Sequence, residues 1–207
     1  MALLTFYTNP QSRGQIVRWM LEETGIEYEV EVLQYGGSMK APEYLAINPM
    51  GKVPAIRHRG TVVTEVAAIC AYLADAFPDA GLAPAVSDPL RGTYYRWLFF
   101  AAGPLEMAVT VKAMKWEAPA ERQGTLGYGN EALTLNALEG AIAGKSYLCG
   151  EQFTAADVYV GSALRWGMLF GTIDKRAVFE AYVSRLEARP ALQRAIALDA
   201  ALIPKPE

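Results

Sequence analysis

Glu65 lies between a short apolar run and a segment with helical spacing of apolar residues. Its carboxylate is a candidate binding group. The apolar stripe at helical spacing that follows it is Val66, Ile69, Cys70 and Leu73. We expect Thr64 to cap this helix and Glu65 to lie in its first turn. A helix N-terminus offers N–H groups to an anion, and a carboxylate offers oxygen atoms to an ammonium group. Together, the helix and the carboxylate are suited to holding the two charged ends of an amino acid.

A second candidate lies just before the strand that leads toward Glu65. The run Val53–Ile56 follows the turn-forming sequence Asn48–Gly51, and Pro54 stands near its start. Proline donates no hydrogen bond to a sheet, so it is typical of a strand end or of a turn with a cis peptide bond. Either arrangement leaves the N–H and C=O of Val53 free to pair with an extended peptide, as a further strand would. The alternative is a loop that merely enters an edge strand.

The order of these features resembles that of the soluble glutathione transferases, with a likeness to bacterial members and no clear subgroup. The matching pieces are Asn48–Pro54, Glu65 with the helix behind it, and a Thr-x-x-Asp box at Thr154 and Asp157. The resemblance extends over essentially the whole chain. It implies a fold with an α/β, thioredoxin-like N-terminal domain followed by an all-α, helical C-terminal domain. The Thr-x-x-Asp box is implied to cap a central helix and to serve folding.

The resemblance also assigns binding roles within the first domain. It implies that Pro54 is cis, that Val53 pairs with the cysteinyl backbone of glutathione, and that Glu65 helps to hold the γ-glutamyl group. Val66 departs from the family pattern, which usually has Ser or Thr after the acid. A hydroxyl contact to the γ-glutamyl carboxylate is therefore missing, although the N–H of Val66 remains available.

Two lysines are candidates for the glycyl carboxylate of glutathione. Lys40 and Lys52 stand at places similar to those of lysines that take this role in some subgroups. The alternative for both is a solvated surface lysine, and for Lys40 the two interpretations have equal weight. Glutathione is implied as a co-substrate, and the sequence indicates no metal.

The residue that activates the glutathione thiol should lie between the first strand and the first helix. A free thiol has a pKa of about 8.5, so a hydroxyl, a cation or a helix N-terminus must stabilise the thiolate. Tyr7, Ser12 and Arg13 are all in this stretch, and it contains no cysteine. Tyr7 matches the tyrosine-type transferases and Ser12 the serine type. We favour Ser12, because a hydroxyl at a helix start is exposed and benefits from the helix field. A plain N-cap role for Ser12 and a core role for Tyr7 are the alternatives.

Periodicity predicts the elements that position these residues. The expected strands are Leu3–Tyr7, Tyr28–Leu33, Val53–His58 and Thr61–Thr64. A helix from about Arg13 to Glu23 should end at Gly25, and Arg59-Gly60 should form a hairpin turn. This is the β-α-β, then β-β-α order of a thioredoxin-like domain. We assign residues 1–78 to that domain and residues 79–88, which are rich in Pro, Ala, Gly and Asp, to a linker.

Beyond the linker, strand signals vanish, and residues 89–207 are expected to be all-helical. The expected helices cover 90–102 with a continuation through Met114, then 131–143, a central helix after Thr154, 176–187 and 191–201. Gly103-Pro104 should break or kink the first of them.

Composition limits the classes of function. The chain has 207 residues, of which 52% are hydrophobic, and a net charge of −3. Disorder and nucleic-acid binding are therefore disfavoured. No apolar run approaches the length of a membrane span, and no signal peptide is evident, so a cytoplasmic protein is expected. The single histidine, His58, lies between two arginines and is given no role. A metal site has no support.

We therefore expect a glutathione transferase that conjugates glutathione to a small apolar electrophile. By resemblance it should be a homodimer, without nucleic-acid or membrane partners. One alternative is a glutathione-dependent peroxide or disulfide reductase. Another is a non-catalytic, transferase-like scaffold that binds protein, which Val66 favours, and which Glu65 and the Val53-Pro54 pair oppose.

Overall fold

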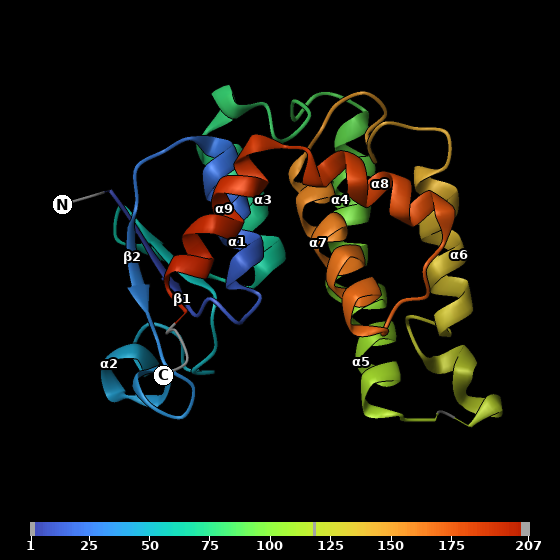
Figure 1. The fold of residues 1–207 in the computed structure, drawn as a ribbon, viewed down its shortest axis with the longest axis horizontal. Helices are drawn as coiled ribbons and strands as arrows, with labels where there is room; N and C mark the ends of the chain where they lie inside the picture. Colours follow the sequence, from blue (N-terminus) through green and yellow to red (C-terminus); the bar gives the residue numbers. More distant parts are fainter. Residues whose placement is uncertain (1–2, 118, 204–207) are drawn as a thin grey trace. The chain divides into compact units, whose positions relative to one another are not determined.

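The computed structural model of the protein describes residues 3–117 and 119–203. The chain forms two compact units, one made of Met1–Ala80 with Arg189–Glu207 and the other of Gly81–Ala188. Each unit has its own core, and each is described here by itself (Figure 1).

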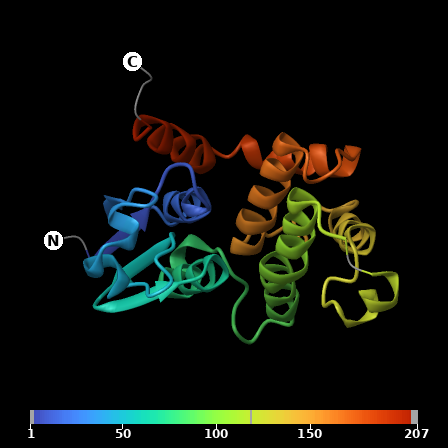
Figure 2. The same cartoon turned by 90° about the horizontal axis from the view of Figure 1, so that it is seen from below.

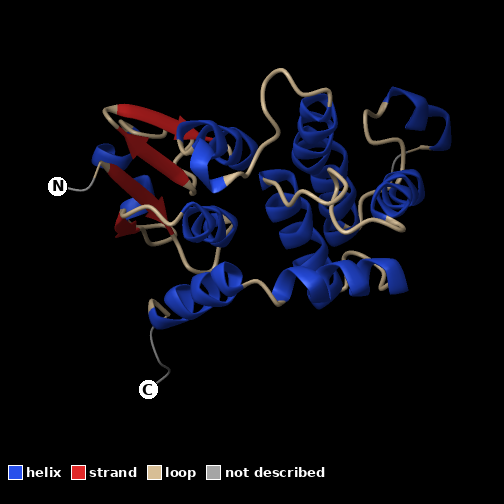
Figure 3. Cartoon of the chain, turned by 90° about the horizontal axis from the view of Figure 1, so that it is seen from above, coloured by secondary structure: helices blue, strands red, loops and turns tan. Residues whose placement is uncertain are grey.

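The first unit is built on a four-stranded mixed sheet (Figure 3). Its strands are β1 (Leu4–Thr8), β2 (Glu29–Val32), β3 (Ala55–His58) and β4 (Thr61–Thr64). They lie in the order β2-β1-β3-β4, with β1 parallel to β2 and antiparallel to β3, and with β3 antiparallel to β4. With helices α1 (Gly14–Thr24) and α3 (Val66–Ala76), this order confirms the expected thioredoxin-like domain. Gly25 ends α1 in the left-handed conformation, as its position predicts.

The two faces of β1 serve different parts of the unit, because successive side chains of a strand point to opposite sides. Phe6 lies under the guanidinium of Arg18 on α1, which is 5.2 Å from the ring centroid. Tyr7 faces the other way, into a cluster with Leu33, Met39, Tyr44 and Ala55. Tyr44 belongs to the short helix α2 (Pro42–Leu45). The cluster therefore joins the start of the candidate site to the segment before Val53.

Helix α9 (Pro190–Ala201) belongs by its contacts to the first unit, although the sequence assigned it to the helical domain 89–207. Figures 1 and 2 show it beside α1. A buried ion pair joins the two helices, with 3.1 Å between Arg18 Nε and Asp199 Oδ1 and side chains 3% and 5% exposed. Arg189 also makes a bidentate contact to Glu23. Local periodicity contains no information on such a pairing across the chain. The linker expected at 79–88 stays a prediction.

The second unit is helical, as expected. Its main helices are α4 (Leu90–Phe100), α5 (Glu106–Met114), α6 (Glu131–Ile142), α7 (Ala155–Phe170) and α8 (Ala177–Glu187). The expected break at Gly103-Pro104 is a π-helical turn, Ala101–Leu105, through which α4 continues into α5 (Figure 1). Proline lacks an N–H, and the wider turn accommodates the lost hydrogen bond. The short 3-10 segment Ala120–Thr125 lies between α5 and α6.

The run Leu90–Met114 corrects one expectation from the sequence. By length and composition alone, this helix is long and apolar enough to cross a membrane, whereas no such run was expected. The expectation failed because the π turn keeps α4 and α5 in one continuous helix. The core helix of a soluble protein passes the same test, so the finding carries no membrane assignment.

The start of α7 has the expected capping box. The Thr154 N–H and hydroxyl donate to Asp157 Oδ2 at 2.8 and 3.0 Å, while the Leu148 N–H and the Tyr182 hydroxyl donate to Oδ1 at 2.8 and 2.6 Å. Asp157 is fully buried. Burial raises the pKa of this carboxyl group, and the four hydrogen bonds oppose that rise. The interpretation of Asp157 as a structural residue is consistent with this geometry.

Candidate functional site

The backbone at Val53 is open, as the sequence predicted. The Val53–Pro54 peptide bond is cis, and β3 begins only at Ala55, two residues later than the strand expected from Val53. Within the described part of the chain, no hydrogen bond uses the N–H or the C=O of Val53. Both groups are therefore available to a bound peptide backbone.

The residues before Val53 are fixed by side chains from α2 and the turn after it. Tyr44 Oη and Asn48 Nδ2 both donate to the carbonyl oxygen of Lys52, at 2.6 and 2.8 Å. Burial raises the pKa of Tyr44 to about 12, so its hydroxyl remains a proton donor at neutral pH. The side chain of Lys52 itself is exposed, as a contact to a ligand carboxylate requires.

Lys40 is tied to the same loop. Its ammonium group donates to the carbonyls of Met50 and Gly51, at 3.1 and 2.8 Å. A side chain at Gly51 would bring Cβ to 2.8 Å from this ammonium nitrogen and 2.9 Å from the Met39 carbonyl oxygen, and the residue has φ of +56°. Lys40 therefore holds the turn in shape, and any contact it makes to a ligand uses its remaining donor.

Glu65 occupies the head of α3, but not in the way expected. It is the N-cap residue itself, with φ 65° and ψ 121°, whereas Thr64, the expected cap, ends β4. The strand runs one residue further toward the helix than a Thr64 cap allows. A positive φ costs a non-glycine residue about 1–3 kcal/mol and is typical of functional sites. The side chain of Glu65 is exposed, and no hydrogen bond or ion pair among the described residues uses its carboxylate.

The first N–H groups of α3 complete this end of the site. Val66, Ala67 and Ala68 have no acceptor for these groups among the residues that the structure describes, and Glu65 provides no side-chain cap. Val66 buries its side chain, so it offers a ligand only its N–H. The helix start therefore offers donors to an anion beside the Glu65 carboxylate.

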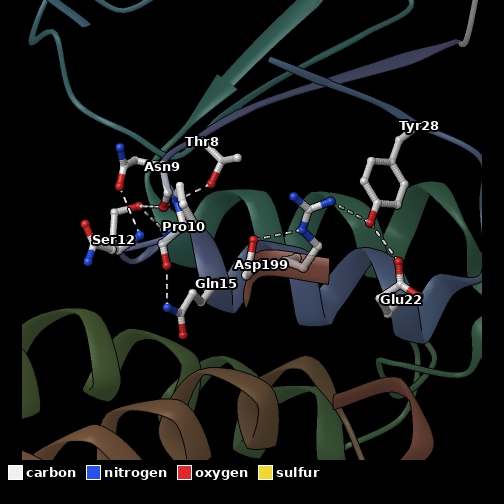
Figure 4. Close-up of polar contacts among 11 residues, drawn as sticks. Thr8, Asn9, Pro10, Ser12, Gln15, Glu22, Tyr28 and Asp199 are labelled. Carbon is white, nitrogen blue, oxygen red and sulfur yellow. Dashed lines mark hydrogen bonds and ion pairs between the residues drawn. The ribbon is translucent and has the colours of Figure 1, made fainter. Parts of the chain in front are cut away.

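Ser12 sits in a tight turn before α1 (Figure 4). Its hydroxyl donates to the Asn9 carbonyl at 2.7 Å, and its Oγ accepts the Gly14 N–H at 2.9 Å. The N-cap residue of α1 is Arg13 and not Ser12, although the Ser12 side chain bonds the N–H of Gly14, the first residue of the helix. The side chain is half-buried, so a ligand can still reach its hydroxyl.

Asn9, which the sequence analysis did not select, holds this turn to the rest of the domain. Its Nδ2 donates to the Leu33 carbonyl at 2.8 Å, and its Oδ1 accepts the Gln11 N–H at 2.9 Å. Its main-chain carbonyl also accepts the Ser12 N–H. The turn-forming Asn9-Pro10 pair was the available signal, because Asn side chains commonly bond to backbone two residues further on.

Tyr7 and Arg13 differ sharply in exposure. Tyr7 is 3% exposed and lies 5.7 Å from Tyr44, measured between ring centroids. Burial raises the pKa of Tyr7, Arg57 opposes that shift, and Glu31 adds to it. The side chain of Arg13 is exposed at the start of α1, where it presents a positive charge.

Strand register brings these separate segments to one end of the sheet. Tyr7 is paired with Ala55, and Ala55 is paired with Thr64. The turn after β1, the open backbone before β3 and the Glu65 cap after β4 therefore lie next to one another. The arrangement offers backbone pairing in the middle, a carboxylate with free N–H groups on one side, and a hydroxyl with a cation on the other. It suits an extended peptide with an amino-acid end and a reactive group.

No cluster of three or more metal-binding side chains occurs among the described residues. His58 is 4% exposed, and its Nδ1 lies 2.8 Å from the Tyr72 hydroxyl, so it serves the core. Cys70 is fully buried, and burial raises its pKa to about 12, so its thiol stays protonated at neutral pH.

Comparison with known proteins shows which family the chain resembles. Residues 12–76 match the family model of the glutathione S-transferase N-terminal domain, and residues 127–190 match that of the C-terminal domain. A glutathione S-transferase of Escherichia coli O157:H7 is 32% identical over 166 residues, which cover 76% of this chain and 78% of the relative.

Two solved structures show the same fold over nearly the whole chain. A glutathione transferase from Methylococcus capsulatus has a TM-score of 0.79 and 30% identity, covering 97% of this chain and 100% of its own. A sphingomonad glutathione S-transferase complexed with glutathione has a TM-score of 0.77 and 29% identity, covering 95% and 98%.

Proposed function

The chain belongs to the glutathione S-transferase family, and we propose that it binds glutathione along Val53 and at the head of α3. Its function is that of a glutathione transferase, supported by relatives of this name and by a structural neighbour with glutathione bound. The observation that carries the binding mode is the alignment of three open groups at one end of the sheet. Glutathione is a γ-glutamyl tripeptide. It has an extended backbone that can pair with Val53 and an amino-acid end that can bind at Glu65 and the start of α3.

Each part of glutathione has a partner in this proposal. The cysteinyl backbone pairs with the N–H and C=O of Val53, beside the cis Pro54. The γ-glutamyl ammonium group contacts Glu65, and its carboxylate accepts N–H groups at the start of α3, including that of Val66. The glycyl carboxylate contacts Lys52, and Lys40 acts with its remaining donor.

The chemistry takes place at the cysteinyl sulfur. The thiol loses its proton to solvent, the thiolate attacks an electrophilic carbon to form a C–S bond, and the leaving group departs with its electron pair. The protein's part is to stabilise the thiolate so that a larger fraction is present at neutral pH. We assign this to Ser12 and Arg13 ahead of Tyr7, which is buried in the α2 cluster.

Ser12 is held ready for this task. Its Oγ accepts the Gly14 N–H, which fixes the oxygen while the hydroxyl proton can still rotate. If that proton turns to the sulfur, the Asn9 carbonyl keeps the Ser12 N–H as a donor. Redirecting the proton therefore leaves no polar group without a partner. Arg13 adds a positive charge at the same helix start.

Replacing Ser12 by alanine should lower kcat about tenfold and leave glutathione affinity nearly unchanged, because one hydrogen bond to a charged sulfur is lost. The pKa of the bound thiol should rise, so the loss should be larger at pH 6.5 than at pH 8. The measurement is the pH profile of kcat/KM. Ser184→Ala, an exposed serine of α8, is the matched control. An unchanged rate in Ser12→Ala would transfer the role to Arg13 or Tyr7.

The second substrate is proposed to be a small apolar electrophile, and the protein is proposed to be a cytoplasmic homodimer. Family membership supports both, together with the apolar surface that the helix Leu90–Met114 presents. Sedimentation of the purified protein would test the dimer. Conjugation of a chloronitrobenzene is the direct test of the activity.

Two other functions use the same fold and are separated by simple experiments. A reductase would consume glutathione with a peroxide or a mixed disulfide, but no cysteine lies in the turn before α1. A non-catalytic scaffold would fail to bind immobilised glutathione. Retention on that resin, with conjugation faster than peroxide reduction, is the result we expect.

A further inference from the structure

Two buried side chains converge on one backbone oxygen, the carbonyl of Lys52, directly before Val53. Tyr44 Oη lies 2.6 Å away and Asn48 Nδ2 lies 2.8 Å away. Tyr44 is 2% exposed and Asn48 is 5% exposed. Both are side chains of the segment that begins at α2, and both donate to this one acceptor. Such a double contact is more than is needed to satisfy one carbonyl group in a turn.

The contact determines where the next N–H points. The Lys52–Val53 peptide is trans, since Val53–Pro54 is the cis bond found in the described chain. In a planar trans peptide, the C=O and the N–H point in opposite directions. Donors that hold the Lys52 oxygen toward α2 therefore turn the Val53 N–H away from α2. In that orientation no group of the described chain accepts it.

We propose that Tyr44 is a positioning residue for glutathione binding. Its hydroxyl, with the amide of Asn48, locks the Lys52–Val53 peptide plane so that the Val53 N–H is presented to the cysteinyl carbonyl of the ligand. The inference rests on the proposed function and deepens it. Tyr44 itself does not contact the ligand. Its ring also packs against Tyr7, with 5.7 Å between centroids, so the hydroxyl is held by a rigid neighbour.

The role predicts a specific pattern of affinities. Tyr44→Phe keeps the ring and removes only the donor, so Asn48 still holds the carbonyl, and the Kd for glutathione should rise about three- to tenfold. Asn48→Ala should have a similar effect. In the double variant the carbonyl has neither donor, so the Kd should rise by more than the product of the two single effects. At saturating glutathione, kcat should stay within about twofold of wild type in Tyr44→Phe.

The experiment is calorimetric titration of glutathione into the full chain. The matched control is Tyr72→Phe, because among the described residues the Tyr72 hydroxyl bonds only to His58 Nδ1. A purely structural role for Tyr44 would lower Tm without changing the Kd, and that result would overturn the proposal. The proposal would also be overturned if the rise in Kd of the double variant were equal to or smaller than the product of the two single rises. If Tyr44→Phe does not fold, Asn48→Ala tests the same carbonyl. Failure of the wild type to bind glutathione would instead contradict the proposed function.

Discussion

Replacing Glu65 by alanine should raise the Kd for glutathione about 30- to 100-fold, because the γ-glutamyl ammonium group loses its only carboxylate partner in the proposed site. Glu65→Gln keeps an acceptor oxygen without the charge and should give an intermediate loss. The measurement is calorimetric titration at two salt concentrations. Since screening weakens charge contacts, the gap between wild type and Glu65→Ala should narrow at high salt.

The backbone of Glu65 allows a second test that separates binding from stability. Its φ of 65° is unfavourable for any side chain, whereas glycine adopts it freely. Glu65→Gly should therefore lose as much affinity for glutathione as Glu65→Ala does. Its free energy of unfolding should be about 1 kcal/mol higher than that of Glu65→Ala. Glu43→Ala, an exposed glutamate of α2, is the charge control and should bind glutathione normally. Equal affinity in wild type and Glu65→Ala would remove Glu65 from the site.

Much of the fold could be predicted from sequence, because its signals are local. Period-two and helical apolar patterns indicated the strands and helices α1 and α3 of the first unit, and Gly25 marked the end of α1. The Thr154–Asp157 spacing predicted the cap of α7. In each case, the residues that form the feature are neighbours in the chain, so spacing alone is informative.

The remaining features depend on contacts between distant residues. Asp199 pairs with Arg18 across 181 positions, and neither residue type indicates its partner. The same limit applies to the site. Val53 and Glu65 were found because a proline and a helix start mark them locally. Tyr44 and Asn9 were missed because their roles come from the oxygen or amide they meet after folding, not from their neighbours in sequence.

Exposure adds a second argument for the preference of Ser12 over Tyr7, which stays a prediction. Tyr7 and Ser12 both stand near the first helix, and spacing could not rank them firmly. The structure buries Tyr7 and raises its pKa, while it keeps Ser12 half-buried with a fixed oxygen. Lys40 bonds the carbonyls of its own loop, so its proposed contact to the ligand depends on its one remaining donor.

Replacing Asp157 by alanine should lower the free energy of unfolding by about 3–5 kcal/mol, the largest effect expected from any single substitution in this chain. Its carboxylate accepts four hydrogen bonds, and each donor is buried with it. Removing the acceptor leaves those donors unsatisfied, which costs more than the hydrogen bonds themselves contribute. For a chain of this size the loss corresponds to a fall in Tm of about 10 °C.

The pattern of related variants distinguishes this structural role from a catalytic one. Asp174→Ala is the matched control, because that aspartate is 72% exposed and its pair with Lys112 is worth less than about 1 kcal/mol. Tyr182→Phe removes one of the four donors and leaves no unsatisfied hydroxyl behind. It should lower the free energy of unfolding by only about 1 kcal/mol. Per folded molecule, Asp157→Ala should keep the wild-type Kd for glutathione, since the carboxylate lies in the second unit and serves the start of α7. A variant that keeps its Tm but loses turnover would contradict this assignment and would place Asp157 in the reaction.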